Sequence, residues 1–414
     1  MKVLQSARQG GDLAQREVAR YVEGMRAEAL DWLQTLVAVD SESPRESAAQ
    51  EIVAQLAGSL GLHAELVDAD PAGELEQDER FVATGMKFSS RSNCVVTLPG
   101  AHGRPLVCNA HIDTVAVGDG WTRKPSGEWD GDRFYGLGAC DTKASTVAAL
   151  LAAACLQHLG DDPASPIELH SVIDEEPGGN GTLALLRARG ADAPLPRLAV
   201  VMEPSRLDLL TGHRGMLWYG LGCLGVQAHG STSNGVNAIE KAAEVVLALR
   251  SLNEELDHWE PGKYPQPRLN TGVIRGGHEV YTTPGSCRVD VSARYAPGQR
   301  EAVDAALQAA FLAGTMPGKV EQLFCMDFDA SETPEDDPGV VAALAALRSQ
   351  RPQAQVSRLT GTCDMRHYRN MLGVPSVIFG PGDLGVAHAP DEYVDVDEIF
   401  VATRMLVDLA LTSF

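Results

Sequence analysis

The sequence predicts an α/β protein in which a larger domain with a largely parallel sheet contains an inserted, smaller α+β domain. Residues 1–211 alternate short apolar runs with helical segments, which is typical of parallel strands joined by helices. Residues 212–328 change to long strands in the order strand-helix-strand-strand-helix-strand, which is the ferredoxin-like order. Residues 329–414 return to the first pattern. A chain of 414 residues also exceeds the roughly 250–300 residues that one core serves, so two domains are expected.

The elements of the larger domain follow from the spacing of apolar residues. These recur every three or four positions in helices and run together in buried strands. A Ser-Glu-Ser-Pro break at residues 41–44 starts the second helix. Helices are expected at residues 13–39, from this break to about 60, and at 143–159, 183–189, 338–348 and 396–411. Strands are expected at residues 63–67, 94–98, 105–109, 167–173, 198–202 and 376–379.

The inserted domain is predicted from its longer strands. Its length of roughly 115 residues is ordinary for a domain. Strands are expected at residues 216–228, 267–274, 286–295 and 320–328, and helices at 237–256 and 301–312.

Composition indicates a globular protein and excludes several classes of partner. Hydrophobic residues make up 44% of the chain and charged residues 22%, as in ordinary globular domains. A net charge of −22 is unfavourable for a general nucleic-acid or anionic-membrane binder, which needs a basic face. The eight cysteines form no C-x-x-C pair, and no stretch is typical of a signal peptide or a membrane span. We therefore expect a cytoplasmic protein with reduced thiols and no nucleic-acid or membrane partner.

Two polar residues come directly after the central predicted strand. His111 and Asp113 are two positions apart, so they share a face if the chain stays extended. We expect Asp113 to hydrogen-bond one imidazole nitrogen of His111 and leave the other free, as around metal-bound histidines. Asp141 follows a glycine-punctuated turn and precedes the helix at 143–159, where backbone N–H groups stabilise an anion. Taken alone, His111 and Asp141 are better explained as a strand cap and a helix cap.

Acidic or histidine residues also follow three other predicted strands. The strands at 167–173, 198–202 and 376–379 are followed, in that order, by Asp174-Glu175-Glu176, by Glu203 and by His388. Three consecutive carboxylates repel one another, so a cation or a raised pKa must offset the cost. Each residue alone also has a structural explanation, as part of a solvated acidic turn, a strand-end acid or an incidental loop histidine.

The recurrence of these residues predicts a metal site. Open α/β sheets place their sites at the carboxyl ends of the strands. Two histidines and three carboxylates suit two divalent ions of the zinc type, with one carboxylate shared, although one ion is an alternative. Zinc is favoured, and cobalt or manganese also suit such ligands. The predicted ligands are His111, Asp141, Glu176, Glu203 and His388.

The chain resembles the zinc metallopeptidase and deacylase family of acetylornithine deacetylase, succinyl-diaminopimelate desuccinylase and bacterial glutamate carboxypeptidase. The matching segments occur in the family's order and cover almost the whole chain. They are AHIDTV, GDGWTRKPSGEWDGDRFYGLGACDTK, DEEPGGNGT, EPS, AHGSTSNGVNAI, RYAPG, GTCDMR and GPGDLGVAHAPDEYV. The resemblance implies a zinc-peptidase-like catalytic domain and an inserted lid or dimerisation domain that pairs two copies of the chain.

The resemblance also implies roles for the predicted ligands. His111 and Glu203 would hold one metal, Glu176 and His388 the other, and Asp141 would bridge both. Glu175 would be the general base on a water that bridges the metals, and Asp113 would orient His111.

Other residues are assigned by the same resemblance. His229 would stabilise the tetrahedral oxyanion, in its own subunit or across a dimer. The substrate-binding residues would be Arg294, Asn270, Gly361 and Thr362. Arg294 suits a carboxylate chemically, and Arg366 either replaces it or pairs with Asp364.

Three features depart from the family pattern or lie beside it. Ala144 stands where the family usually has glycine, and the segment after His229 lacks a usual proline and is shorter. Cys140 and Cys363 lie next to predicted site residues, and we interpret them as small buried thiols.

The sequence thus predicts a metal-dependent amidohydrolase that removes an acyl group, of the acetyl or succinyl type, from an N-acyl amino acid. A dinuclear zinc dipeptidase or carboxypeptidase is the alternative within the same chemistry. A noncatalytic small-molecule binding protein on this fold is the alternative from another class.

Overall fold

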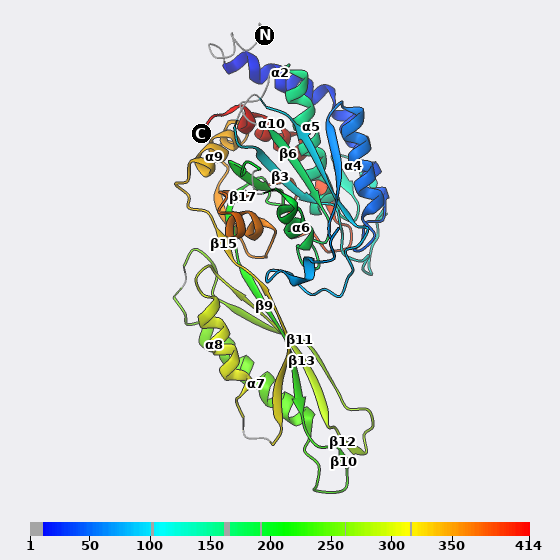
Figure 1. The fold of residues 1–414 in the computed structure, drawn as a ribbon, viewed down its shortest axis with the longest axis vertical. Helices are drawn as coiled ribbons and strands as arrows, with labels where there is room; N and C mark the ends of the chain where they lie inside the picture. Colours follow the sequence, from blue (N-terminus) through cyan, green and yellow to red (C-terminus); the bar gives the residue numbers. More distant parts are fainter. Residues whose placement is uncertain (1–10, 101–102, 161–165, 191–192, 261, 315–316) are drawn as a thin grey trace. The chain divides into compact units, whose positions relative to one another are not determined.

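The structure is a computed structural model that describes residues 11–100, 103–160, 166–190, 193–260, 262–314 and 317–414. The chain separates into two compact units, and Figure 1 labels many of their elements. The first unit comprises Met1–Gly212, Glu332–Ser357 and Cys363–Phe414. The second unit comprises His213–Ser331 and Arg358–Thr362. Residues 1–10 of the predicted first domain lie outside the described part.

A mixed sheet forms the centre of the first unit. Within the described residues its strands follow the order β1-β2-β6-β3-β7-β17-β8-β15, and β16 pairs with β8. The strands are β1 (His63–Asp68), β2 (Ser92–Leu98), β3 (Leu106–His111), β6 (Ile167–Val172), β7 (Leu198–Val201), β8 (Leu209–His213), β15 (Ser331–Glu332), β16 (Val356–Leu359) and β17 (Ser376–Ile378).

The four central strands β6, β3, β7 and β17 are parallel to one another. Every residue of β3, β7 and β17 is buried, because their apolar side chains are covered on both faces of the sheet. The prediction of a largely parallel sheet is confirmed for this centre. The flanking pairs β1–β2, β2–β6 and β17–β8 are antiparallel. The carboxyl ends of the four parallel strands therefore lie at one edge.

Helices surround this sheet close to the predicted positions. They are α2 (Gly11–Gly24), α3 (Arg26–Ala38), α4 (Ser47–Ser59), α5 (Ala144–His158), α6 (Asn180–Ala188), α9 (Pro338–Gln350) and α10 (Val396–Leu411). The alanine-rich α5 is buried along nearly its whole length and packs against α10 and α3. By length and composition alone, the segment Ala139–His158 could cross a membrane, which the sequence pattern did not indicate. Its most apolar window is completely buried inside the protein, as expected of a core helix.

A small three-stranded sheet was not predicted. It consists of β4 (Glu128–Asp130), β5 (Arg133–Tyr135) and β18 (Tyr393–Asp395), in the order β18-β5-β4. Three residues are too few to show a period, so such strands escape pattern analysis. The sheet holds the loop after β3 against the segment that precedes α10.

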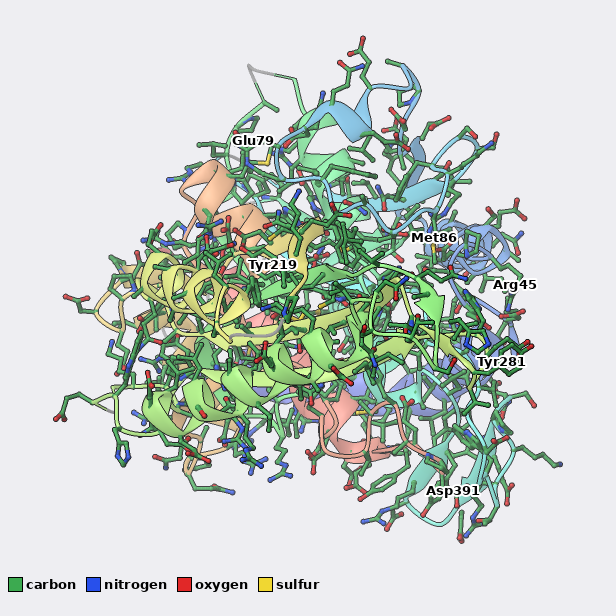
Figure 2. All side chains as sticks on the ribbon, turned by 90° about the horizontal axis from the view of Figure 1, so that it is seen from below. Arg45, Glu79, Met86, Tyr219, Tyr281 and Asp391 are labelled. Atoms are coloured by element: carbon green, nitrogen blue, oxygen red, sulfur yellow. The ribbon has the colours of Figure 1, made fainter. Side chains whose placement is uncertain are left out.

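The second unit has the predicted ferredoxin-like order. Its elements are β9 (Gly215–Leu224), α7 (Ala238–Leu256), β11 (Arg268–Gly276), β13 (Ser286–Tyr295), α8 (Arg300–Phe311) and β14 (Lys319–Phe328). The strands pair antiparallel in the order β11-β13-β9-β14, and α7 and α8 lie side by side against the sheet (Figure 1). Tyr219 of β9 meets Phe311 of α8 edge-on, with ring centroids 5.2 Å apart. Figure 2 shows Tyr219 beside the yellow helix. A short pair, β10 (Ala228–His229) with β12 (Thr282–Thr283), completes the unit.

Candidate metal centre

The five predicted ligands come together in the first unit as two overlapping groups. The first group is His111, Asp141 and Glu203, and the second is Asp141, Glu176 and His388. Within each group the possible ligand atoms all lie within 4.8 Å of one another. Asp141 belongs to both groups, as expected of a shared carboxylate.

The parallel strands explain this convergence. His111 ends β3, Glu176 follows β6, Glu203 follows β7, and His388 lies in the loop after β17. The carboxyl ends of parallel neighbours meet at one edge, where open α/β sheets carry their sites. Asp141 reaches the same place from the turn before α5.

Asp141 contacts one histidine with each carboxylate oxygen. Its Oδ1 lies 3.0 Å from Nε2 of His111, and its Oδ2 lies 3.3 Å from Nε2 of His388. Oε1 of Glu176 is 2.9 Å from the same His388 nitrogen. Burial raises the pKa of Asp141, but the hydrogen bonds from the two histidines outweigh it and hold that pKa well below its usual value.

The other acids of the site repel one another. Burial raises the pKa of Glu203 well above its usual value, and the nearby carboxylate of Asp141 adds to this shift. Burial and the charge of Glu203 raise the pKa of Glu175 in the same way, and burial also raises that of Glu176. Imidazole nitrogens and carboxylate oxygens are the ligands that zinc-type ions take, and cations offset this repulsion. The donor set therefore fits two divalent metal ions.

Asp113 is adjacent to the site, but its contacts differ from the prediction. Nδ1 of His111 lies 3.0 Å from the carbonyl oxygen of Asp113 and 3.7 Å from its carboxylate, so the carbonyl orients the ring. The carboxylate accepts the backbone N–H groups of Glu175 and Glu176, each at 3.1 Å. The prediction of a carboxylate–imidazole hydrogen bond is therefore wrong. The chain turns after β3, so the Asp113 side chain points to the turn that follows the neighbouring strand β6.

Sequence reasoning missed the residues behind this acidic turn. Arg91 is buried and donates to both carboxylate oxygens of Glu46, with Nε 3.2 Å from Oε2, and to Asp174 at 3.1 Å. Ser43 lies between two acids, 2.7 Å from Glu46 and 3.1 Å from Asp113. Arg91 is 45 positions from Glu46 and 83 from Asp174, and Ser43 is 70 from Asp113, so no local motif indicates these contacts.

The two cysteines and Arg366 fit structural roles. Cys140 and Cys363 are buried, and burial raises the pKa of both thiols well above the usual value. Arg366 donates to the carbonyl oxygens of Gly178 at 2.7 Å and of Cys363 at 3.4 Å.

The remaining predicted residues lie in the second unit. Nη1 of Arg294 donates to Oγ1 of Thr362 at 2.5 Å, and burial lowers the pKa of the guanidinium. Asn270 is exposed on β11, opposite Ser292 of β13. Gly361 directly precedes Thr362 in the sequence. His229 is exposed at the end of β10, and its Nδ1 lies 2.8 Å from Oγ of Ser231.

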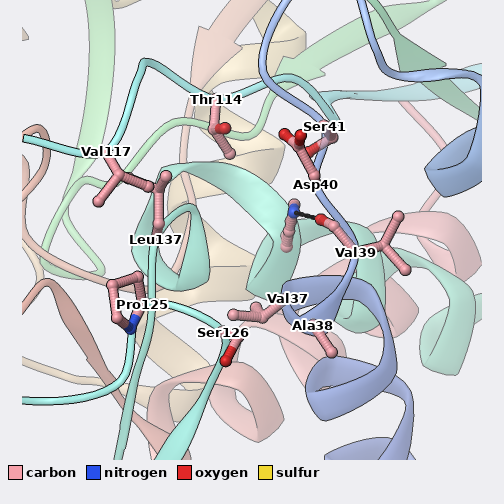
Figure 3. Close-up of a pocket in the computed structure, with 11 residues that line it drawn as sticks. Val37, Ala38, Val39, Asp40, Ser41, Thr114, Val117, Pro125, Ser126 and Leu137 are labelled. Atoms are coloured by element: carbon pink, nitrogen blue, oxygen red, sulfur yellow. Dashed lines mark hydrogen bonds between the residues drawn. The ribbon is translucent and has the colours of Figure 1, made fainter.

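A pocket of about 170 Å³ lies between the end of α3 and the turn before α5 (Figure 3). Lys143 forms part of its wall, and its ammonium donates to the carbonyl oxygens of Leu36 at 3.0 Å and Val39 at 3.2 Å. These carbonyls end a helix, where a cation is stabilised. Burial lowers the pKa of Lys143 to about 8. None of the five predicted ligands lines this pocket, so we assign the metal centre elsewhere.

Several known proteins are similar to this chain. The acetylornithine deacetylase of Myxococcus xanthus is 32% identical over 309 residues, which cover 72% of this chain and 78% of that protein. The structure of a dipeptidase, Dug1p of Saccharomyces cerevisiae, matches with a TM-score of 0.76 at 12% identity, covering 96% of this chain and 98% of that one. A Bacillus subtilis protein described as a dinuclear metal-binding peptidase matches with a TM-score of 0.65 at 13% identity, covering 94% and 98%.

A family model also matches most of the chain. The description of that family is peptidase family M20/M25/M40, and the match spans residues 107–412. This range contains all five ligand positions and Glu175. The chain belongs to the peptidase family M20/M25/M40, whose members are hydrolases that act on amide bonds.

Proposed function

We propose that the protein is a metal-dependent amidohydrolase that removes an acyl group, of the acetyl or succinyl type, from an N-acyl amino acid. The observation that carries this proposal is the pair of ligand groups that share Asp141. The acetylornithine deacetylase similarity supports the acyl amino acid as substrate.

The proposed cofactor is a pair of divalent metal ions, with zinc favoured and cobalt or manganese as alternatives. His111 and Glu203 would hold one ion, Glu176 and His388 the other, and Asp141 would hold both. When bound, such ions polarise the substrate carbonyl and lower the pKa of water.

Glu175 is the proposed general base. Its backbone is held by Asp113, and its carboxylate is close enough to Glu203 to be strongly affected by that charge. Glu175 takes a proton from the attacking water, whose oxygen bonds to the acyl carbon. It then delivers the proton to the nitrogen as the carbon–nitrogen bond breaks. The products are a carboxylate and a free amine.

We also propose roles for residues of the second unit. His229 would stabilise the oxyanion, and Arg294 would bind the substrate carboxylate together with Asn270, Gly361 and Thr362. The hydrogen bond from Arg294 to the Thr362 hydroxyl supports a shared role for these two residues. We further propose that residues 212–328 act as the lid and dimerisation domain between catalytic segments 1–211 and 329–414. The protein would be a cytoplasmic homodimer, and the eight free cysteines support a reducing compartment.

A dipeptidase or carboxypeptidase activity is the second candidate, and the structural match to a yeast dipeptidase favours it. Purified protein loaded with zinc is offered acetyl-, succinyl- and formyl-amino acids beside dipeptides, and release of free amine is followed. We expect the highest kcat/KM on an acyl amino acid. Preference for dipeptides would select the second candidate. Absence of hydrolysis together with tight binding would indicate a noncatalytic binding protein.

A further inference from the structure

Glu392 is a buried acid that binds the turn carrying Asp141. Glu392 is only 1% exposed to solvent. Its carboxylate accepts three backbone N–H groups, from Gly138 at 3.2 Å, Cys140 at 2.9 Å and Asp141 at 3.1 Å. Its own carbonyl accepts the N–H of Gly136 at 2.9 Å. One residue therefore holds most of the turn between β5 and α5.

The backbone of this turn explains why an acid is needed there. Asp141 and Thr142 have non-helical backbone angles, with φ of −119° and −131°, and α5 begins only at Ala144. The N–H groups of Cys140 and Asp141 thus precede the regular helix and need an acceptor from elsewhere. Buried N–H groups without partners cost free energy, and a carboxylate accepts several at once.

Glu392 also joins the two segments whose ligands meet. It lies four residues after His388, and β18 starts at the next residue and pairs with β5. Asp141 and His388 approach within 3.3 Å of each other. The Glu392 carboxylate belongs to the segment that carries His388, and it accepts the N–H of Asp141. It therefore sets the separation of the Asp141 and His388 side chains.

We propose that Glu392 is a positioning residue that places Asp141 for metal binding, an inference that rests on the proposed role of Asp141 as the shared ligand. Burying a second carboxylate close to Asp141 is unfavourable for its charge, since the two acids repel. The three N–H bonds reduce this cost, and they fix the backbone that carries Asp141.

The test compares Glu392→Gln with Asp391→Asn. Asp391 is the matched control because it also accepts three hydrogen bonds in the same segment, but from Thr122 and Arg123. Asp391 lies beside the cyan ribbon of the loop that carries Thr122 and Arg123 (Figure 2). Zinc affinity of the metal-free proteins is measured by competition with a chromophoric chelator, and thermal unfolding is measured with and without zinc.

Glu392→Gln keeps the shape of the side chain but replaces one acceptor oxygen by an NH₂ group facing an N–H. We expect zinc affinity to fall about 10- to 100-fold, the usual cost of losing a residue that orients a ligand. The rise in Tm on adding zinc should shrink in the same variant, whereas Asp391→Asn should keep wild-type affinity within about twofold. A role confined to folding would lower the Tm of the metal-free protein and leave zinc affinity unchanged.

Wild-type zinc affinity in folded Glu392→Gln would overturn the inference. If that variant does not fold, Glu392→Asp, which keeps the charge and withdraws the carboxylate by one methylene, is measured by the same criterion. The wild-type protein separates the two proposals. Failure of the wild type to bind zinc contradicts the proposed function, whereas equal binding by wild type and variant contradicts only the role of Glu392.

Discussion

The carboxylate of Asp113, two positions after His111, accepts the backbone N–H of Glu175 at 3.1 Å and so holds the backbone of the proposed general base. The carbonyl of the same aspartate lies 3.0 Å from Nδ1 of His111. One residue thus connects the end of β3 to the turn after β6. This connection keeps a proposed ligand and the proposed base in a fixed relation.

Replacing Asp113 should therefore affect chemistry and metal binding together. Asp113→Asn places an NH₂ group against the N–H of Glu175 or Glu176 and shifts their turn. We expect kcat to fall about 10- to 100-fold, with a parallel fall in zinc affinity. Steady-state kinetics and metal analysis of the same preparation check this. Unchanged kcat would show that the turn does not depend on this carboxylate.

Glu175→Ala should separate metal binding from turnover. The variant keeps all five proposed ligands, so its zinc content should equal that of the wild type. Loss of the general base should lower kcat by about 10²- to 10⁴-fold. Single-turnover kinetics with a measured metal content provide the test. Full activity would remove Glu175 from the mechanism.

Arg91 should matter mainly for stability. Arg91→Met leaves the buried acids Glu46 and Asp174 without this cation, and breaking a buried ion pair costs about 3–5 kcal/mol. Urea unfolding measures the loss. Arg45→Ala is the control, since its partners Asp40 and Glu42 are on the surface, where such pairs contribute about 0–1 kcal/mol. Equal effects of the two substitutions would contradict the assigned role of Arg91.

The pH dependence of the unfolding free energy should reveal the contribution of the partly buried acid Glu168. Burial raises the pKa of Glu168, but its bonds to His170 and Arg189 outweigh this and lower the pKa to about 2. Because the folded pKa lies below the usual value, the stabilisation is complete above about pH 4.5 and is lost as the pH falls through 2. The shift corresponds to about 3 kcal/mol. The unfolding free energy of the wild type should fall more steeply between pH 5 and 2 than that of Glu168→Gln, and parallel curves would contradict the shift.

Long periodic elements could be predicted from the sequence, and short ones could not. The predicted helix at 396–411 and strand at 286–295 match α10 and β13 residue for residue, because each repeats its pattern over ten or more positions. The strands β4, β5 and β18 contain three residues each and show no period. The pairing of β18 with β5 also joins distant parts of the chain, since Val394 lies opposite Phe134.

The candidate site divides in the same way. The convergence of the five proposed ligands could be predicted because four lie at or after the ends of parallel strands and the fifth precedes a helix, which are local signals. The contact between the Asp113 carbonyl and His111 could not be predicted. The expectation that residues two positions apart share a face holds only where the chain stays extended, and here it turns. Glu392 and Arg91 act on residues distant in sequence, at positions that no local pattern marks.

The most direct test is the number and position of bound metal ions. Protein loaded with zinc is measured by elemental analysis and by anomalous diffraction from its crystals. We predict two ions per chain, one among His111, Asp141 and Glu203 and one among Asp141, Glu176 and His388. A chain that hydrolyses its substrate without metal, or that binds zinc away from these residues, would contradict the account.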